Sequence, residues 1–158
     1  MDGEHNRAAS SAAVSTTISH PRDHVIQDTS VAISGDTDIV SVRQKGREMA
    51  ATLGFSPSEL TLIATAISEL ARNIVLYAKK GEIVLRLIER GELRGILIHA
   101  CDHGPGISDI RRVLQGGYST SRSLGLGLSG VKRLMDEFEI ESKVGSGTKV
   151  TVRKWNRK

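Results

Sequence analysis

The chain has 158 residues, a length that fits one domain with its own hydrophobic core. Its only cysteine, Cys101, excludes an intramolecular disulfide bond. The formal net charge is +4, but aromatic residues form only 3% of the chain and Lys and Arg form no dense stripe, so the composition argues against a nucleic-acid-binding protein. The N-terminal residues lack the apolar core of a secretory signal, and we expect a cytoplasmic protein with no membrane-spanning segment.

Residues 1–27 are predicted to form a disordered polar tail ahead of a single domain over residues 28–158. The tail is rich in Ser, Ala, Thr and Asn and shows little hydrophobic periodicity. It contains three histidines at a spacing that fits no zinc site, namely His5, His20 and His24.

The domain is predicted to begin with a strand, the run TSVAIS from Thr29, followed by two helices. The first helix starts near Asp36, where a polar side chain offers an N-cap, and stops at Gly54. The second starts at the sequence SPSE, which combines a capping box with Pro at the first helical position. Apolar residues at helical spacing then continue to about Ala78.

Two strands joined by a short hairpin are predicted from the runs EIVLRLIER and RGILIHACD. A stretch rich in Gly and Ser follows over residues 103–127, with a short helical piece at DIRRVLQ. A third helix over about 127–138 and a last hairpin, EIESK and GTKVTVRKW, complete the chain. Because strands and helices do not alternate regularly, this order predicts an α+β two-layer sandwich, with helices on one face of a mixed or antiparallel sheet.

A polar pair in the second predicted helix is the first candidate for a functional site. Glu69 and Asn73 in the sequence ELARN are four residues apart and therefore project from one helix face. The carbonyl oxygen of Asn73 suits Mg²⁺, which prefers oxygen ligands, and Glu69 could accept a proton from an attacking hydroxyl. Taken alone, the pair is better explained by an ordinary solvated helix surface.

The second candidate is Asp102-His103-Gly104-Pro105-Gly106, which follows an apolar strand. A carboxylate at a strand end is held rigidly and can accept a hydrogen bond from an amino group such as that of adenine. Gly104 and Gly106 leave room for a ring beside the backbone. A plain turn after a strand has a similar composition.

The third candidate is Gly125-Leu126-Gly127-Leu128 at the start of the third predicted helix. Glycines at a helix N-terminus let backbone N–H groups point at an anion. The alternative is a flexible linker with an N-cap. No Gly-Lys-Ser/Thr follows, which excludes a Walker loop.

The fourth candidate is Gly145-Ser146-Gly147-Thr148 in the last hairpin. The hydroxyl of Thr148 could donate a hydrogen bond to Asp102 or to the base of a nucleotide. An ordinary hairpin turn is the alternative.

In this order and spacing, ELARN, DHGPG, GLGL and GT closely resemble the four nucleotide-binding boxes of the GHKL (Bergerat-fold) ATPases, over roughly residues 29–155. The strings SELARNIVLYA, GVKRLMDEFEI and VGSGT are most similar to the switch kinases of stressosomes, within the wider group of anti-sigma factor serine/threonine kinases. The resemblance implies the Bergerat two-layer fold and transfer of a phosphoryl group from ATP to a protein hydroxyl.

The resemblance also implies a role for each matching residue. Asp102 would bind the adenine amino group with help from Thr148, and Asn73 would hold Mg²⁺. Glu69 would be the catalytic base. The other matching residues would frame the nucleotide, with residues 107–124 as a lid: Gly104, Gly106, Gly125, Leu126, Gly127 and Leu128. His103 departs from the usual box residue and is expected to be exposed, and Arg122 in the lid is a candidate contact for the γ-phosphate.

By the same resemblance, the substrates would be STAS-domain proteins of the stressosome or anti-anti-sigma type, and the released kinase would activate a PP2C-type phosphatase. Two alternatives stay open. The chain could be an anti-sigma factor that binds a sigma factor directly, with ATP gating the contact, or a detached histidine-kinase ATPase domain.

Overall fold

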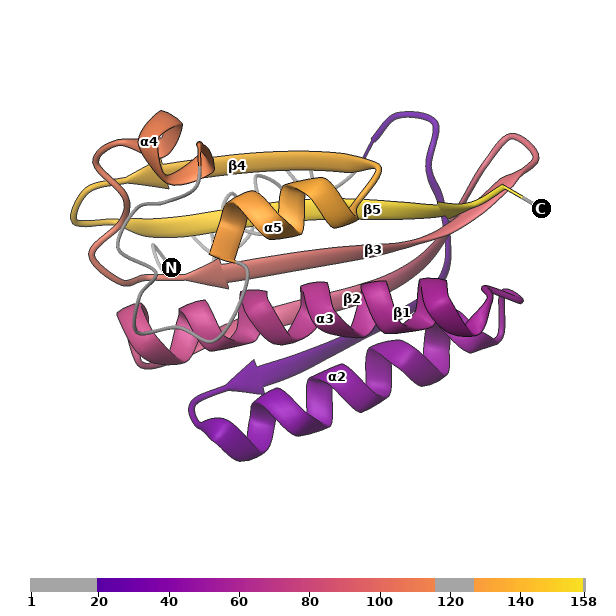
Figure 1. Cartoon of the computed structure of the whole chain (residues 1–158), viewed down its shortest axis with the longest axis horizontal. Coiled ribbons are helices and arrows are strands. Elements are labelled where there is room, and N and C mark those ends of the chain that lie inside the picture. The colour runs from indigo at the N-terminus through magenta and orange to yellow at the C-terminus, as the bar shows by residue number, and fades with distance from the viewer. Residues whose placement is uncertain (1–19, 116–126, 158) are drawn as a thin grey trace, which may run out of the picture.

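The computed structural model describes residues 20–115 and 127–157, and in them a five-stranded sheet forms one layer of the molecule (Figure 1). Its strands are β1 (His24–Ile33), β2 (Gly81–Arg90), β3 (Leu93–Asp102), β4 (Glu137–Lys143) and β5 (Gly147–Asn156). They lie in the order β1-β2-β3-β5-β4, and all four neighbouring pairs are antiparallel. The predicted α+β sandwich is therefore confirmed, and of the two sheet types expected the antiparallel one is present and not the mixed one.

The second layer consists of helices on one face of this sheet (Figure 1). They are α2 (Asp36–Ala51), α3 (Pro57–Asn73) with a π-helical turn η1 (Ile74–Ala78), the short α4 (Ile110–Leu114) and α5 (Gly127–Leu134). Helix α3 lies between α2 and α5 and contacts both. It is therefore the central helix of this layer, with side chains both in the core and near the end of the sheet.

Helix α3 starts where the capping box predicts. The side chain of Ser56 accepts the N–H of Glu59 at 3.2 Å, and the carboxylate of Glu59 accepts the N–H of Ser56 at 3.2 Å. By length and composition alone, Pro57–Ala78 could cross a membrane, in contrast to the expectation of no membrane-spanning segment. In the structure its apolar side is buried against the sheet, as in the core helix of a soluble protein: Ile63, Ile67, Leu70 and Ile74.

Successive side chains of β2 and β3 point to opposite faces of the sheet. On β2 and β3 the side chains toward the helices are apolar and form the main core: Ile83, Leu85, Leu87, Ile96, Ile98 and Ala100. Burying each large aliphatic side chain contributes roughly 1.5–3 kcal/mol. The opposite face carries buried polar groups, among them His99 on β3 and Arg153 on β5.

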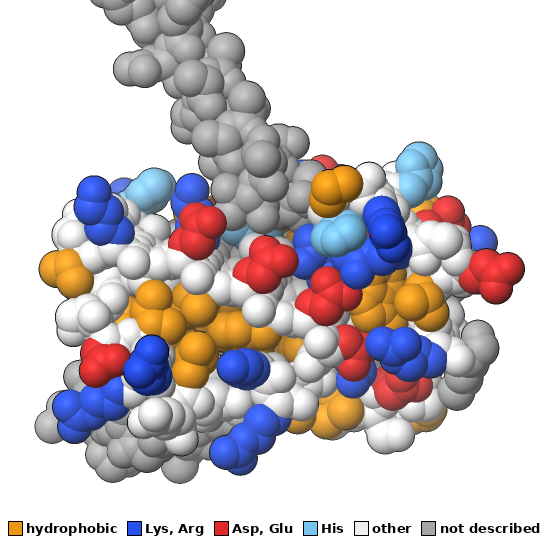
Figure 2. Space-filling model, turned by 90° about the horizontal axis from the view of Figure 1, so that it is seen from above, with side chains coloured by type: hydrophobic (Ala, Val, Ile, Leu, Met, Phe, Trp, Pro, Cys, Tyr) orange, Lys and Arg blue, Asp and Glu red, His pale blue; other side chains and the backbone are white. Residues whose placement is uncertain are grey.

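The edge strand β4 carries a glutamate at every second position, from Glu137 to Glu141. Glu137, Glu139 and Glu141 point away from the helices, while Phe138 and Ile140 pack against the core. Figure 2, which views the molecule from this side, shows acidic side chains along the surface beside a strip of hydrophobic ones. Charged side chains on an edge strand oppose its pairing with another chain.

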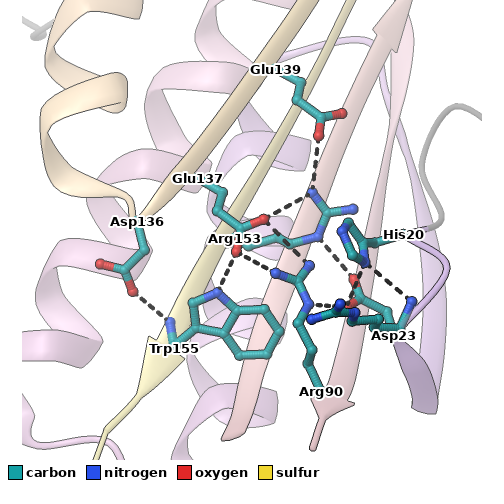
Figure 3. A network of polar contacts seen from close by, with 9 residues as sticks. His20, Asp23, Arg90, Asp136, Glu137, Glu139, Arg153 and Trp155 are labelled. Atoms are coloured by element: carbon teal, nitrogen blue, oxygen red, sulfur yellow. Dashed lines mark hydrogen bonds and ion pairs between the residues drawn. The ribbon is translucent and has the colours of Figure 1, made fainter.

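The first strand begins earlier than predicted, at His24 instead of Thr29, so the predicted boundary between tail and domain falls inside β1. Asp23, just before the strand, is only 3% exposed and binds Arg90 at 2.7 Å and Arg153 at 3.0 Å (Figure 3). These contacts join residues that are far apart in the sequence, which explains why the local composition did not reveal them. The predicted disorder of residues 1–19 lies outside the described part of the chain.

Candidate functional site

A cavity of about 310 Å³ lies at the end of the sheet where β3 ends, a size typical of small-molecule sites. Its walls come from α3, η1, the loop after β3, α4, α5 and β5. Six of the residues predicted for the site line it: Asn73, Asp102, Gly106, Gly127, Leu128 and Thr148. The structure therefore brings together residues from all four sequence motifs.

Asp102 and Thr148 are partners in the ladder between β3 and β5. Asp102 is two residues from the core residue Ala100 on β3, and Thr148 is two residues from the core residue Val150 on β5. Both side chains therefore lie on the helix-covered face of the sheet. Oδ1 of Asp102 accepts the N–H of Gly104 at 2.9 Å. In the described part of the chain no protein donor contacts Oδ2, which leaves this oxygen as an acceptor for a ligand in the cavity.

Two glycines hold the loop after β3 close to its neighbours. A Cβ on Gly104 would lie 2.6 Å from Cβ of Ala78 in η1. Gly106 has φ +76°, and a Cβ there would overlap the carbonyl oxygen of Lys143. Because larger residues would force the loop outward, these glycines set the shape of the cavity. His103, in the same loop, is exposed, as expected.

Asn73 is the last residue of α3, half-buried at the cavity wall. The helix then widens into the π-helical turn η1, and such turns are frequent at functional sites. Tyr77 in this turn lines the cavity and is 60% exposed. The turn ends at Lys79, which has φ 73° and is the only non-glycine residue with positive φ among the described residues.

Glu69 lies one helical turn before Asn73 but does not line the cavity, and it is 5% exposed. Its Oε1 accepts a bond from Nη1 of Arg72 at 2.7 Å, and its Oε2 accepts the N–H of Gly127 at 3.3 Å. The carboxylate thus joins α3 to the start of α5. In this structure both oxygens are engaged by the protein.

The third motif is described only in part. Gly127, with φ +66°, and Leu128 open α5 and line the cavity. Gly125, Leu126 and Arg122 lie outside the described residues. Of the predicted lid, Ile107 and Val113 line the cavity, whereas residues 116–124 are not described.

Sequence reasoning missed the apolar lining of the cavity and one polar residue beside it. Leu70 and Ile74 belong to the buried core, and they also face the ligand space. Ser142 on β4 was not singled out, although its partner in the hairpin ladder is Thr148. Counting back across the predicted turn from Thr148 would have found it.

The chemistry of this cavity fits an adenine nucleotide. Its apolar walls suit a planar ring, Asp102 offers an acceptor for an amino group, and the N-terminus of α5 suits phosphate groups. The chain belongs to the histidine kinase-like ATPase domain family, whose model matches residues 34–154. It is therefore an ATP-binding domain.

Within this family the chain is a serine/threonine-protein kinase similar to RsbT. The serine/threonine-protein kinase RsbT of Bacillus subtilis (strain 168) is 53% identical over 128 residues, which are 80% of this chain and 96% of RsbT. The anti-sigma F factor of Caldanaerobacter subterraneus subsp. tengcongensis is 33% identical over 110 residues, covering 67% of this chain and 77% of that protein.

Solved structures agree on the fold. A chain of the SiaB–SiaC complex from Pseudomonas aeruginosa matches with a TM-score of 0.57 at 15% identity and covers 97% of this chain and 99% of that one. The RsbU and RsbW domains of a Mycobacterium tuberculosis protein match with a TM-score of 0.56 at 21% identity, covering 82% of this chain and 33% of that one. At these identities the structures show the fold alone.

Proposed function

We propose that this kinase transfers the γ-phosphoryl group of ATP to a serine or threonine of a STAS-domain protein, of the stressosome or anti-anti-sigma type. The observation that carries the proposal is the convergence of Asn73 from α3 and Asp102 from β3 on one cavity. The sequence similarity to RsbT supports the choice of reaction. Regulation of a sigma-factor pathway in the cytoplasm, with activation of a PP2C-type phosphatase by the released kinase, follows from the same resemblance.

Each site residue has a proposed task. Oδ2 of Asp102 would accept a hydrogen bond from the amino group of adenine, and the side-chain oxygen of Asn73 would hold Mg²⁺. The described residues contain no cluster of three or more His, Cys, Asp or Glu that could hold a metal ion. A single amide ligand fits Mg²⁺, because this ion completes its octahedral shell with phosphate oxygens and water. When bound, ATP would supply the phosphoryl group, and Mg²⁺ would neutralise part of its negative charge.

Glu69 is proposed as the base for the acceptor hydroxyl. A bond forms between the hydroxyl oxygen and the γ-phosphorus, the bond from the γ-phosphorus to the bridging oxygen breaks, ADP leaves and the proton passes to the carboxylate. Since Glu69 is buried and bonded to Gly127 and Arg72, the substrate hydroxyl has to share the carboxylate with these donors or displace one of them. Phosphates bound at the N-terminus of α5 would compete for the N–H of Gly127.

The test is incubation of the protein with radiolabelled ATP and the STAS-domain proteins of the same organism, followed by phosphoamino-acid analysis. We expect acid-stable phosphoserine or phosphothreonine on a STAS-domain protein. Acid-labile phosphate would support a detached histidine-kinase ATPase domain and contradict the proposal.

A second candidate function is favoured by the similarity to anti-sigma F factors. In this alternative the protein binds a sigma factor directly and ATP gates the contact. Co-purification separates the two functions: a sigma factor retained in an ATP-dependent manner supports the alternative, whereas retention of STAS-domain proteins supports the kinase.

A further inference from the structure

Ser142, on the strand next to the cavity, is placed to control a cavity residue. Its Oγ accepts the N–H of Ile107 at 2.8 Å and donates to the carbonyl oxygen of Gly147 at 3.1 Å. It also lies 2.8 Å from Oγ1 of Thr148, which lines the cavity. One hydroxyl thus ties the loop after β3, the β4–β5 hairpin and Thr148 together.

Counting protons assigns a direction to the bond between the two hydroxyls, in which either oxygen could by itself be the donor. A serine hydroxyl has one proton to donate and two lone pairs that accept. The carbonyl of Gly147 can only accept, and in the arrangement on which the inference rests it takes the proton of Ser142, while the N–H of Ile107 occupies one lone pair. The remaining lone pair can only accept, so Thr148 is the donor. The single hydroxyl proton of Thr148 is then bonded to Ser142 and is not available to a ligand in the cavity.

We infer that Ser142 is a specificity-determining residue, because it fixes Thr148 as a hydrogen-bond acceptor toward the cavity. Together with Oδ2 of Asp102, Thr148 then presents two acceptors to the edge of the bound base. A 6-amino purine carries two N–H donors at this edge and satisfies both. A 6-oxo purine places a carbonyl oxygen there and offers a single N–H, at N1, so at least one of the two acceptors faces the carbonyl oxygen and stays unpaired.

This inference rests on the proposed nucleotide site, and it concerns how that site selects its base. Ser142 acts through Thr148 and not by touching the nucleotide. Its loss would free the proton of Thr148, which could then turn to the cavity and donate to a 6-oxo group. The expected signature is a change in selectivity between bases, which a merely loosened hairpin would not produce.

The experiment is calorimetric titration of the full chain with ADP and with IDP in Mg²⁺ buffer. The wild type is expected to bind ADP more tightly than IDP. In Ser142→Ala the ratio of the two affinities should fall by about three- to tenfold, the range of one hydrogen bond. Ser146→Ala is the matched control, because this serine lies in the same hairpin and is exposed, and the ratio should stay within about twofold.

A double-mutant cycle tests whether Ser142 acts through Thr148. In a Thr148→Val background, Ser142→Ala should leave the ratio unchanged. Equal weakening of ADP and IDP binding, or the same change in ratio with and without the Thr148 hydroxyl, would overturn the inference while leaving the nucleotide site intact. If Ser142→Ala binds neither nucleotide, Thr148→Val alone decides, because removing the acceptor must itself lower the ratio. A wild-type protein that binds no ADP refutes the proposed function and the inference with it.

Discussion

The N–H of Gly127 donates to Oε2 of Glu69 at 3.3 Å, so the carboxylate proposed as the base also holds the first residue of α5. Arg72 binds the other oxygen at 2.7 Å. Glu69 therefore combines a structural contact with its proposed chemical task. Replacements that keep or remove the hydrogen-bonding oxygen can separate the two.

Glu69→Gln should retain nucleotide binding and lose phosphotransfer. The amide oxygen can still accept a bond from Gly127 or Arg72, but the side chain cannot take a proton. We expect ADP affinity within about threefold of the wild type, and a transfer rate lower by at least about 100-fold, the usual contribution of a general base. Calorimetry and single-turnover labelling of the substrate measure the two quantities. A labelling rate equal to that of the wild type would exclude Glu69 as the base, and Glu69→Ala should add a loss of stability.

Asn73→Ala should remove the effect of Mg²⁺ on nucleotide binding. The wild type is expected to bind ADP more tightly with Mg²⁺ than with EDTA, because the Asn73 oxygen joins the metal to the cavity wall. In the variant the two affinities should become equal within about twofold. Asn73→Asp is the control, since its carboxylate keeps an oxygen ligand. A full Mg²⁺ effect in Asn73→Ala would show that another group holds the ion.

Asp23→Ala should strongly destabilise the fold, although Asp23 lies outside the predicted domain. Its removal takes from Arg153, whose side chain is 2% exposed, the contact at 3.0 Å and leaves it only longer ion pairs with more exposed carboxylates, among them Glu137 at 3.6 Å. Breaking a buried ion pair costs about 3–5 kcal/mol. Glu89→Ala is the matched control, because its partner Arg94 is 63% exposed and a surface pair of this kind should contribute no more than about 1 kcal/mol. Urea unfolding of both variants measures the difference, and equal losses would contradict a structural role for residues 20–23.

His99 should make stability depend on pH. Burial and the nearby charges of Lys149 and Arg86 lower its pKa from 6.5 to about 4. Because the unfolded chain binds the proton near pH 6.5 and the folded chain only near pH 4, stability is lost as the pH falls through this window. Between pH 7 and pH 5, His99→Gln should lose less unfolding free energy than the wild type, by about 2 kcal/mol. Identical losses in urea titrations of both proteins would contradict this effect.

The fold was largely predictable because its signals are local. The capping box at Ser56 and the apolar spacing of α3 depend on neighbouring residues, and the structure confirms both. The start of β1 was not predictable, since it is fixed by ion pairs from Asp23 to Arg90 and Arg153. Such long-range contacts leave no pattern near Asp23 in the sequence.

The candidate site shows the same division. The motifs predicted that Asn73, Asp102 and Thr148 meet, and the structure places them around one cavity. The surroundings of Glu69 could not be predicted, because its contact with Gly127 depends on how α5 packs against α3. Ser142 was missed because its role follows from the number of protons at three contacts and not from a motif.

The most direct test of the central claim is calorimetric titration of Asp102→Asn with ADP. The amide oxygen of Asn would remain with the N–H of Gly104, which turns the NH₂ group toward the cavity and sets donor against donor at the adenine amino group. We predict that binding becomes undetectable while the unfolding temperature of the ligand-free protein changes little. ADP affinity equal to that of the wild type would contradict the assignment of this cavity as the nucleotide site.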